Sequence, residues 1–152
     1  MQQLVSLLYK KGLCIASIES LTAGLFAAKI AEVENASRIL KGALVTYQTQ
    51  AKIETLKIPS SFFENNAVIS RACVEQMVRY GMQMFHCDVV VACSGNAGPG
   101  ALDNEPVGKV FMAILYQGNT TCFEKLFQGN RNQIREQVCT FLAKQVCDIV
   151  NC

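Results

Sequence analysis

Three apolar runs, each followed at once by small or polar residues, constrain the fold of this chain most strongly. They span residues 13–18, 40–47 and 88–93, and short runs of this kind are typical of buried strands. Stretches with the helical spacing of apolar residues lie between them. Strands that alternate with helices pair into a sheet, and the loops after their carboxyl ends gather at one edge, where α/β proteins bind ligands.

The remaining segments complete an α/β domain. Residues 107–115 and 120–127 indicate a β-hairpin joined at Gln117-Gly118-Asn119, so part of the sheet should be antiparallel. The predicted order of elements is α-β-α-β-α-α-β-β-β-α, which favours a three-layer α/β/α fold with a mixed sheet, in one domain over residues 1–152. The expected helices cover residues 3–10, 23–31 with Thr22 as N-cap, 49–56, a longer helix capped by Ser70, and a last helix capped by Asn130 with Gln133.

The composition excludes several classes of protein. Hydrophobic residues make up 51% of the 152 residues and charged residues only 17%, which is typical of a compact globular chain and not of a disordered one. The net charge of +2 is not concentrated in a basic run, so we expect no nucleic-acid partner. Charges interrupt the apolar stretches and the N-terminus lacks a signal-peptide pattern, so we expect a cytoplasmic protein that does not enter a membrane.

The eight cysteines do not indicate a disulfide framework. They form no Cys-x-x-Cys pair, and several, such as Cys14 and Cys93, occupy apolar positions where cysteine acts as a small hydrophobe. We therefore expect mostly reduced thiols. The single histidine, His86, and the neighbouring Cys87 have no further ligand at a suitable spacing, so we expect no metal.

Two of the loops carry side chains suited to nucleophilic catalysis. Ser20 follows the first apolar run, and Lys52 lies in the first turns of the helix after the second run. A serine can attack a carbonyl with lysine as its base and no histidine, provided that burial lowers the pKa of the amine towards neutrality. Amide N–H groups around Thr22 to Gly24, at a helix N-terminus, could then stabilise the developing oxyanion.

Ordinary structural roles remain open for these residues when the pattern is considered alone. A turn serine, a solvated helix lysine and a tight glycine turn such as residues 94–100 are all common in proteins. The pattern by itself therefore indicates a candidate site and does not establish an enzyme.

Five short signatures occur along the chain in order. Together they resemble the CinA C-terminal domain family, whose members include nicotinamide-nucleotide amidohydrolases, over about residues 4–141. The signatures are Glu19-Ser20-x-Thr22-x-Gly24, residues 42–47 followed by Ala51-Lys52, Ala67-Val68-Ile69-Ser70, Ser94-Gly95-x-Ala97-Gly98-Pro99 with Pro106-Val107-Gly108, and Phe127-x-Gly129-x-Arg131 with Arg135.

The resemblance implies a fold, a reaction and a set of site residues. The fold is that of the CinA C-terminal domain, and the reaction is hydrolysis of the carboxamide of nicotinamide mononucleotide to nicotinate mononucleotide and ammonia, without metal or cofactor. The resemblance implies Ser20 as nucleophile, Lys52 as its base, and Tyr47 beside them. The substrate-binding and positioning residues that it implies are Glu19, Thr22, Gly24, Ser94, Gly95, Ala97, Gly98, Arg131 and Arg135, the two arginines for the ligand phosphate or a subunit contact.

Departures from the family pattern leave other functions open. Leu21 and Ala23 replace a cysteine and a glycine, and the methyl of Ala23 could crowd a backbone that approaches the substrate. Gln48-Thr49 replaces Ser-Asn, Asn96 replaces an apolar residue, and Asn130 replaces an aspartate. These changes are compatible with a divergent hydrolase or with a non-catalytic nucleotide-binding module. A protein-interaction domain is a third interpretation, because the family is linked by name to competence and DNA damage.

The resemblance also implies the partners of the chain. One is a small-molecule nucleotide substrate. The other is a second copy of the chain, because members of the family assemble, so we expect a homo-oligomer.

Overall fold

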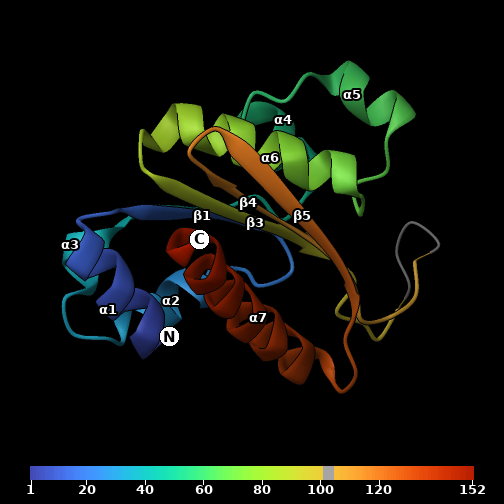
Figure 1. The fold of residues 1–152 in the computed structure, drawn as a ribbon. Coiled ribbons are helices and arrows are strands. Elements are labelled where there is room, and N and C mark those ends of the chain that lie inside the picture. Colours follow the sequence, from blue (N-terminus) through green and yellow to red (C-terminus); the bar gives the residue numbers. More distant parts are fainter. Residues whose placement is uncertain (101–104) are drawn as a thin grey trace.

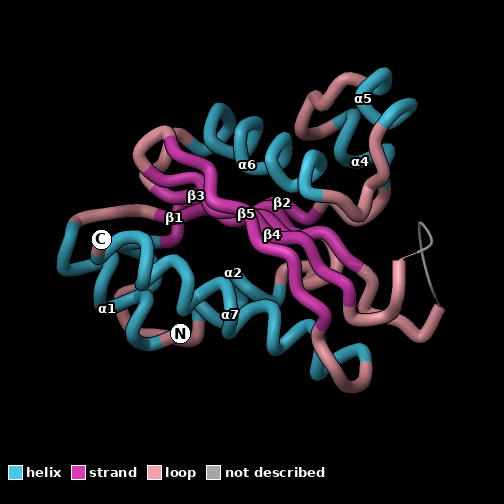
Figure 2. The backbone as a smooth tube through the Cα atoms, turned by 45° about the vertical axis from the view of Figure 1, so that its right-hand side comes forward, coloured by secondary structure: helices cyan, strands magenta, loops and turns pink. Residues whose placement is uncertain are grey.

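A five-stranded sheet forms the centre of the protein, which is represented by a computed structural model describing residues 1–100 and 105–152 (Figure 1, Figure 2). The strand order is β2-β1-β3-β4-β5. β1 (Ile15–Glu19) runs parallel to both β2 (Leu40–Val45) and β3 (Val89–Gly95). β4 (Lys109–Tyr116) is antiparallel to β3 and to β5 (Asn119–Leu126), so the predicted mixed sheet is confirmed.

Helices cover both faces of the sheet and give it the predicted three-layer α/β/α architecture (Figure 1). One face carries α1, α2, α3 and α7, and the other carries α4, α5 and α6. Their bounds are α1 (Gln2–Lys11), α2 (Leu25–Ala31), α3 (Ala36–Ile39), α4 (Thr49–Glu54), α5 (Ser60–Asn65), α6 (Arg71–Phe85) and α7 (Arg131–Asn151).

The apolar run of β3 is buried on both faces because successive side chains of a strand point to opposite sides. Val89 and Val91 pack into the core beneath α1, α2 and α7, whereas Val90 and Ala92 pack into the core beneath α6. Gly81 lets α6 approach the sheet closely, since a Cβ there would lie only 2.7 Å from Ile18. The two cores hold the carboxyl ends of β1 and β3 side by side.

Most predicted elements are present, and their caps explain where they begin. Ser70 accepts a hydrogen bond from Cys73 N at 3.1 Å, and Asn130 forms a capping box with Gln133. The hairpin turn consists of Gln117 and Gly118, both with positive φ as a type I′ turn requires. The short helices α3 and α5, of 4 and 6 residues, were not predicted because they are too short to show a period.

One predicted cap is wrong. α2 begins at Leu25 and not at Ala23, and the Thr22 side chain does not cap it. The residue before the helix is Gly24, with φ of 91°, and a carboxylate from the preceding strand bonds the first amides of the helix instead.

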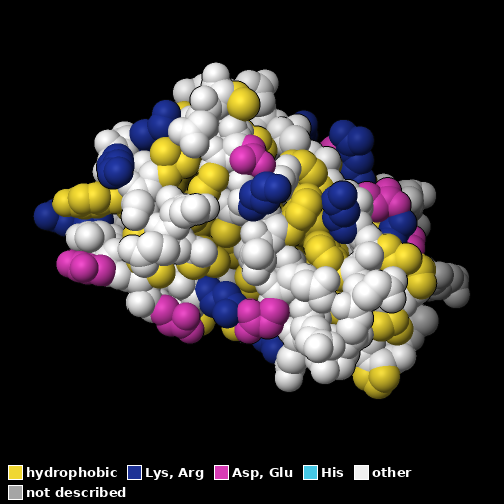
Figure 3. Space-filling view, turned by 60° about the horizontal axis from the view of Figure 1, so that its bottom comes forward, with side chains coloured by type: hydrophobic (Ala, Val, Ile, Leu, Met, Phe, Trp, Pro, Cys, Tyr) yellow, Lys and Arg dark blue, Asp and Glu magenta, His cyan; other side chains and the backbone are white. Residues whose placement is uncertain are grey.

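Two general expectations can be compared with the structure. None of the eight cysteines, all of which lie within the described ranges, forms a disulfide. Within the described ranges, no helix has both the length and the apolar character needed to cross a bilayer. On the face in Figure 3, which is turned from Figure 1 to bring its lower side forward, basic side chains lie scattered among acidic and apolar ones.

Candidate active site

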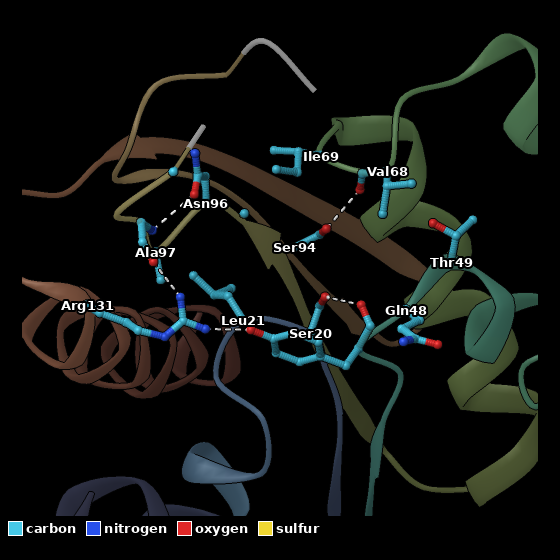
Figure 4. Close-up of a pocket in the computed structure, with 14 residues that line it drawn as sticks. Ser20, Leu21, Gln48, Thr49, Val68, Ile69, Ser94, Asn96, Ala97 and Arg131 are labelled. Carbon is cyan, nitrogen blue, oxygen red and sulfur yellow. Dashed lines mark hydrogen bonds between the residues drawn. The ribbon is translucent and has the colours of Figure 1, made fainter. Parts of the chain in front are cut away.

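A pocket of about 630 Å³ opens where the three parallel strands end (Figure 4). This volume suits a small molecule. The lining comes from five places: the loop after β1, the loop after β2 with the first residue of α4, the segment before α6, the end of β3 with its following loop, and the first residue of α7. The lining residues are Ser20, Leu21, Tyr47, Gln48, Thr49, Val68, Ile69, Ser94, Gly95, Asn96, Ala97, Gly98, Gly100 and Arg131.

The structure brings together Ser20, which lines the pocket, and Lys52, which is buried beside it and is not among the lining residues. Lys52 Nζ lies 3.3 Å from Ser20 Oγ, within hydrogen-bonding distance. The same amine donates to the carbonyl oxygen of Thr46 at 2.6 Å. The Ser20 hydroxyl also lies 3.5 Å from the carbonyl oxygen of Tyr47, toward which it can donate. Residues 32 positions apart in sequence are thus close enough for direct proton transfer.

Lys52 is fully buried, with 0% of its surface exposed. Burial lowers the pKa of its amine below the ordinary value of 10.5, because the charged form loses its hydration. The nearby thiols of Cys73 and Cys93 oppose this shift. A lysine with a lowered pKa and a serine hydroxyl in contact has the properties of a general base.

Glu19 supports the serine turn from below and does not line the pocket. Its buried carboxylate accepts hydrogen bonds from Gly24 N at 2.8 Å, Phe26 N at 3.2 Å and Ala27 N at 3.1 Å. The hydroxyl of Ser17 donates to the same carboxylate at 2.8 Å. A negative charge at a helix N-terminus is favourable, and here it joins the end of β1 to the start of α2. Glu19 and Gly24 are therefore part of the turn's framework.

The amide N–H groups expected as oxyanion donors are largely used within the turn. Ala23 N donates to the carbonyl oxygen of Ser20 at 3.0 Å, and Gly24 N donates to Glu19. The expectation is therefore wrong for these two amides. Thr22 lies behind the pocket, where its hydroxyl and the thiol of Cys93 share a hydrogen bond at 3.1 Å. Ala23 is exposed and outside the pocket lining, so its methyl does not crowd the ligand space.

The opposite wall is built by the end of β3 and its loop. The Ser94 hydroxyl donates to the carbonyl oxygen of Val68 at 2.8 Å, which joins this wall to the segment before α6. Buried Asn96 donates to the carbonyl oxygen of Glu105 at 3.1 Å and accepts from Gly98 N at 3.0 Å. Gly95 was among the predicted substrate-binding and positioning residues. A Cβ at this position would lie 2.6 Å from the carbonyl oxygen of Lys109, so a larger residue would not fit.

The two arginines of α7, Arg131 and Arg135, make contacts in different parts of the site. Arg131 lines the pocket and donates to the carbonyl oxygen of Gly98 and to the hydroxyl of Tyr47, both at 2.5 Å (Figure 4). Arg135 is outside the lining and donates to the carbonyl oxygens of Leu21 and Thr22. Only Arg131 is therefore placed to meet a ligand directly.

Sequence reasoning missed several residues of the pocket. For Asn96, the sequence did contain one indication of a role in the pocket, since this residue replaces an apolar residue of the family pattern. Gln48 and Thr49 were noted only as departures, and Val68 and Ile69 only as part of a signature. Within residues 1–100 and 105–152, no group of three or more His, Cys, Asp or Glu residues could hold a metal ion.

Comparison with known proteins agrees with this fold. The chain matches the family model of the CinA C-terminal domain over residues 1–149. It is 40% identical over 125 residues to the "Protein MG115 homolog" of Mycoplasma pneumoniae, covering 82% of this chain and 80% of that protein. It is 35% identical over 132 residues to a "CinA-like protein" of Dictyoglomus thermophilum, covering 86% of this chain but only 32% of that longer protein.

A solved structure shows the same fold. The competence damage-inducible protein A from Klebsiella pneumoniae superposes with a TM-score of 0.93 at 23% identity, covering 99% of this chain and 96% of that chain. The solved structure shows the fold alone, whereas the family model and the Mycoplasma relative also show the family. The chain belongs to the CinA C-terminal domain family.

Proposed function

We propose that this chain hydrolyses the carboxamide of nicotinamide mononucleotide to nicotinate mononucleotide and ammonia. In this reaction Ser20 is the nucleophile and Lys52 is its base. The observation that carries the proposal is the 3.3 Å distance between Lys52 Nζ and Ser20 Oγ beside the pocket. A buried amine with a lowered pKa supports the role of Lys52 as a base.

The first half of the reaction forms an acyl-enzyme. Neutral Lys52 takes the proton of the Ser20 hydroxyl while Oγ attacks the carbonyl carbon of the carboxamide. The carbonyl oxygen of Thr46, 2.6 Å from the amine, stabilises the ammonium that results. Lys52 then returns this proton to the departing nitrogen, the C–N bond breaks, and ammonia leaves.

The second half releases the acid. A water molecule attacks the ester on Ser20, and Lys52 takes a proton from that water. Lys52 gives the proton to Ser20 Oγ as the ester bond breaks, which restores the hydroxyl and releases the carboxylic acid product. Of the groups that exchange protons in this cycle, Ser20 Oγ already lies in contact with Lys52 Nζ, at 3.3 Å.

The pocket has features that suit a phosphorylated nicotinamide. Arg131 would bind the phosphate through its guanidinium, which matches phosphate oxygens well. The half-exposed ring of Tyr47 offers an aromatic surface to the cationic pyridinium.

Two departures from the family pattern leave the site intact, which favours the hydrolase over a non-catalytic binding module. Ala23 is exposed outside the pocket, and Asn130 still caps α7. Neither side chain bonds the Ser20 hydroxyl or the Lys52 amine.

Ammonia release from nicotinamide mononucleotide tests the proposal, with nicotinamide and related amides as further substrates. We expect release by the unmodified chain and its loss in Ser20→Ala and Lys52→Ala, while both variants unfold in a cooperative transition. Ser61→Ala and Lys144→Ala are matched controls at exposed positions and should keep full activity. Stabilisation by the nucleotide without ammonia release would instead support the binding module. Full activity of Lys52→Ala would contradict the role of lysine.

A further inference from the structure

Arg135 directs its guanidinium at the backbone of the turn that carries the nucleophile. Its Nε donates to the carbonyl oxygen of Leu21 at 3.1 Å, and Nη2 donates to the carbonyl oxygen of Thr22 at 2.7 Å. The third nitrogen, Nη1, donates to Asn132 Oδ1 at 3.2 Å. All three nitrogens thus bind protein groups, and Arg135 does not line the pocket.

The contact selects one conformation of the turn. In extended backbone, successive carbonyl groups point in opposite directions, so one guanidinium edge could not reach both. Arg135 holds two successive carbonyls with the parallel N–H groups of one edge, which requires the backbone to turn at Leu21 and Thr22. A lysine could not reproduce this contact, because its ammonium is a single point charge.

The turn needs such support because its backbone is strained. Ala23 has φ of 50° and the following Gly24 has φ of 91°. The left-handed conformation is unfavourable for a residue with a side chain, such as Ala23, and it persists only where surrounding contacts enforce it. Glu19 holds the far end of the turn through Gly24 N. Arg135 holds the two residues directly after Ser20.

The helix that carries Arg135, α7, is held in place by core packing and by its N-terminal cap. The neighbouring residues Ile134 and Val138 are buried in the core that also contains β1 and β3 residues. The capping box at Asn130 fixes the first turn of the same helix. Contacts 113 and 114 residues apart in sequence therefore set the backbone next to the nucleophile.

We propose that Arg135 is a positioning residue, which holds the turn of residues 20–24 so that Ser20 Oγ stays within reach of Lys52 Nζ. This role depends on the proposed function of that pair. It replaces the phosphate-binding or subunit role that the sequence resemblance implied for Arg135. Arg131 keeps the place of the ligand-binding arginine.

The test measures the reactivity of Ser20 without using the nucleotide. A fluorophosphonate probe labels activated serines, and its rate of attachment is compared in the unmodified chain, Arg135→Met, Arg135→Lys and the exposed control Lys144→Met. We expect labelling to slow about 10- to 100-fold in Arg135→Met, because small displacements of a nucleophile have effects of this size. Arg135→Lys, which keeps the charge, should fall nearly as far, and Lys144→Met should match the unmodified chain.

Hydrogen exchange of the turn provides a second readout. The amides of Ala23 and Gly24 should exchange faster in both Arg135 variants, while amides of the β3 core keep their protection. Steady-state kinetics with the nucleotide should show a lower kcat with little change in KM.

The outcomes separate this proposal from the proposed function. Normal labelling and normal exchange in the folded Arg135 variants would overturn the positioning role. A raised KM with unchanged kcat would also overturn it, in favour of phosphate binding. If Ser20 of the unmodified chain is not labelled, the proposed nucleophile fails and the proposed catalytic role of Arg135 fails with it. Labelling of Ser20 without nucleotide hydrolysis would contradict only the proposed substrate.

Discussion

Two walls of the pocket are held in different ways. The serine wall is the turn of residues 20–24, and the opposite wall is the end of β3 with its loop, residues 94–98. On the serine wall, buried or half-buried groups bind the backbone: Glu19 bonds three helix amides, Arg135 bonds two carbonyls, and Lys52 bonds Thr46. On the opposite wall, the buried side chains of Ser94 and Asn96 bond three backbone groups. Arg131, which bonds Gly98 of this wall, is exposed, and it contacts the 50% exposed Tyr47 through side-chain atoms. The proposed reacting atoms are thus fixed from behind, whereas the proposed ligand-binding groups Arg131 and Tyr47 hold each other through a contact that a ligand can replace.

The largest stability effect should come from the serine wall. Glu19→Gln turns an amide NH₂ group toward backbone N–H groups and removes a buried charge that accepts four hydrogen bonds. We expect the free energy of unfolding to fall by about 2–4 kcal/mol. Denaturant titration beside Glu64→Gln, an exposed control on α5, measures the difference. Equal stability of the two variants would show that the serine wall is not held as described.

Arg131→Ala should affect ligand binding and leave stability nearly unchanged. Because Arg131 is the proposed phosphate ligand, we expect KM for nicotinamide mononucleotide to rise about 10-fold, with a smaller change in kcat. Arg135→Met should show the reverse pattern. Steady-state kinetics of both variants therefore separates the two walls. An unchanged KM in Arg131→Ala would remove the arginine from the ligand site.

Asn96→Ala should destabilise the opposite wall moderately. The change leaves Gly98 N and the carbonyl oxygen of Glu105 without the amide that now bonds both. We expect a loss of about 1–2 kcal/mol in the free energy of unfolding, because two buried hydrogen bonds are lost. Asn65→Ala, at an exposed position, is the control for denaturant titration. A loss as large as that of Glu19→Gln would mean that the two walls are held equally firmly.

The smallest expected effect is the contribution of Lys52 to the pH dependence of the free energy of unfolding. Burial lowers the pKa of Lys52 in the folded chain, so the unfolded chain binds more protons between that lowered pKa and 10.5. The stability of the folded chain should therefore rise with pH across this window. Lys52→Met lacks the group, so its stability relative to the unmodified chain should fall as pH increases. Denaturant titrations of both chains through this window check the direction, and a constant difference would contradict the lowered pKa.

Local sequence patterns predicted the framework because they depend on neighbouring residues. The buried run of β3, the cap at Ser70 and the Gln117-Gly118 turn each carry their own signal. The same reasoning placed Ser20 and Lys52 at one edge, since parallel strands end together there.

Contacts that depend on the folded shape of the serine turn could not be predicted in this way. Glu19 replaces Thr22 as the group that bonds the first amides of α2, and only the folded turn shows which side chain faces inward. Arg135 meets Leu21 and Thr22 across more than 110 residues, and its helical position alone is equally compatible with solvent or a ligand. The short helices α3 and α5 likewise depend on tertiary packing and not on a period.

The pH dependence of Ser20 labelling tests the central claim most directly, namely that burial enables Lys52 to take the proton of Ser20. In the unmodified chain, the labelling rate should rise with pH and level off at an apparent pKa below 10.5, the ordinary value for lysine. Lys52→Met should be labelled far more slowly and should lack this inflection. The same rate and the same pH profile in both folded proteins would contradict the account.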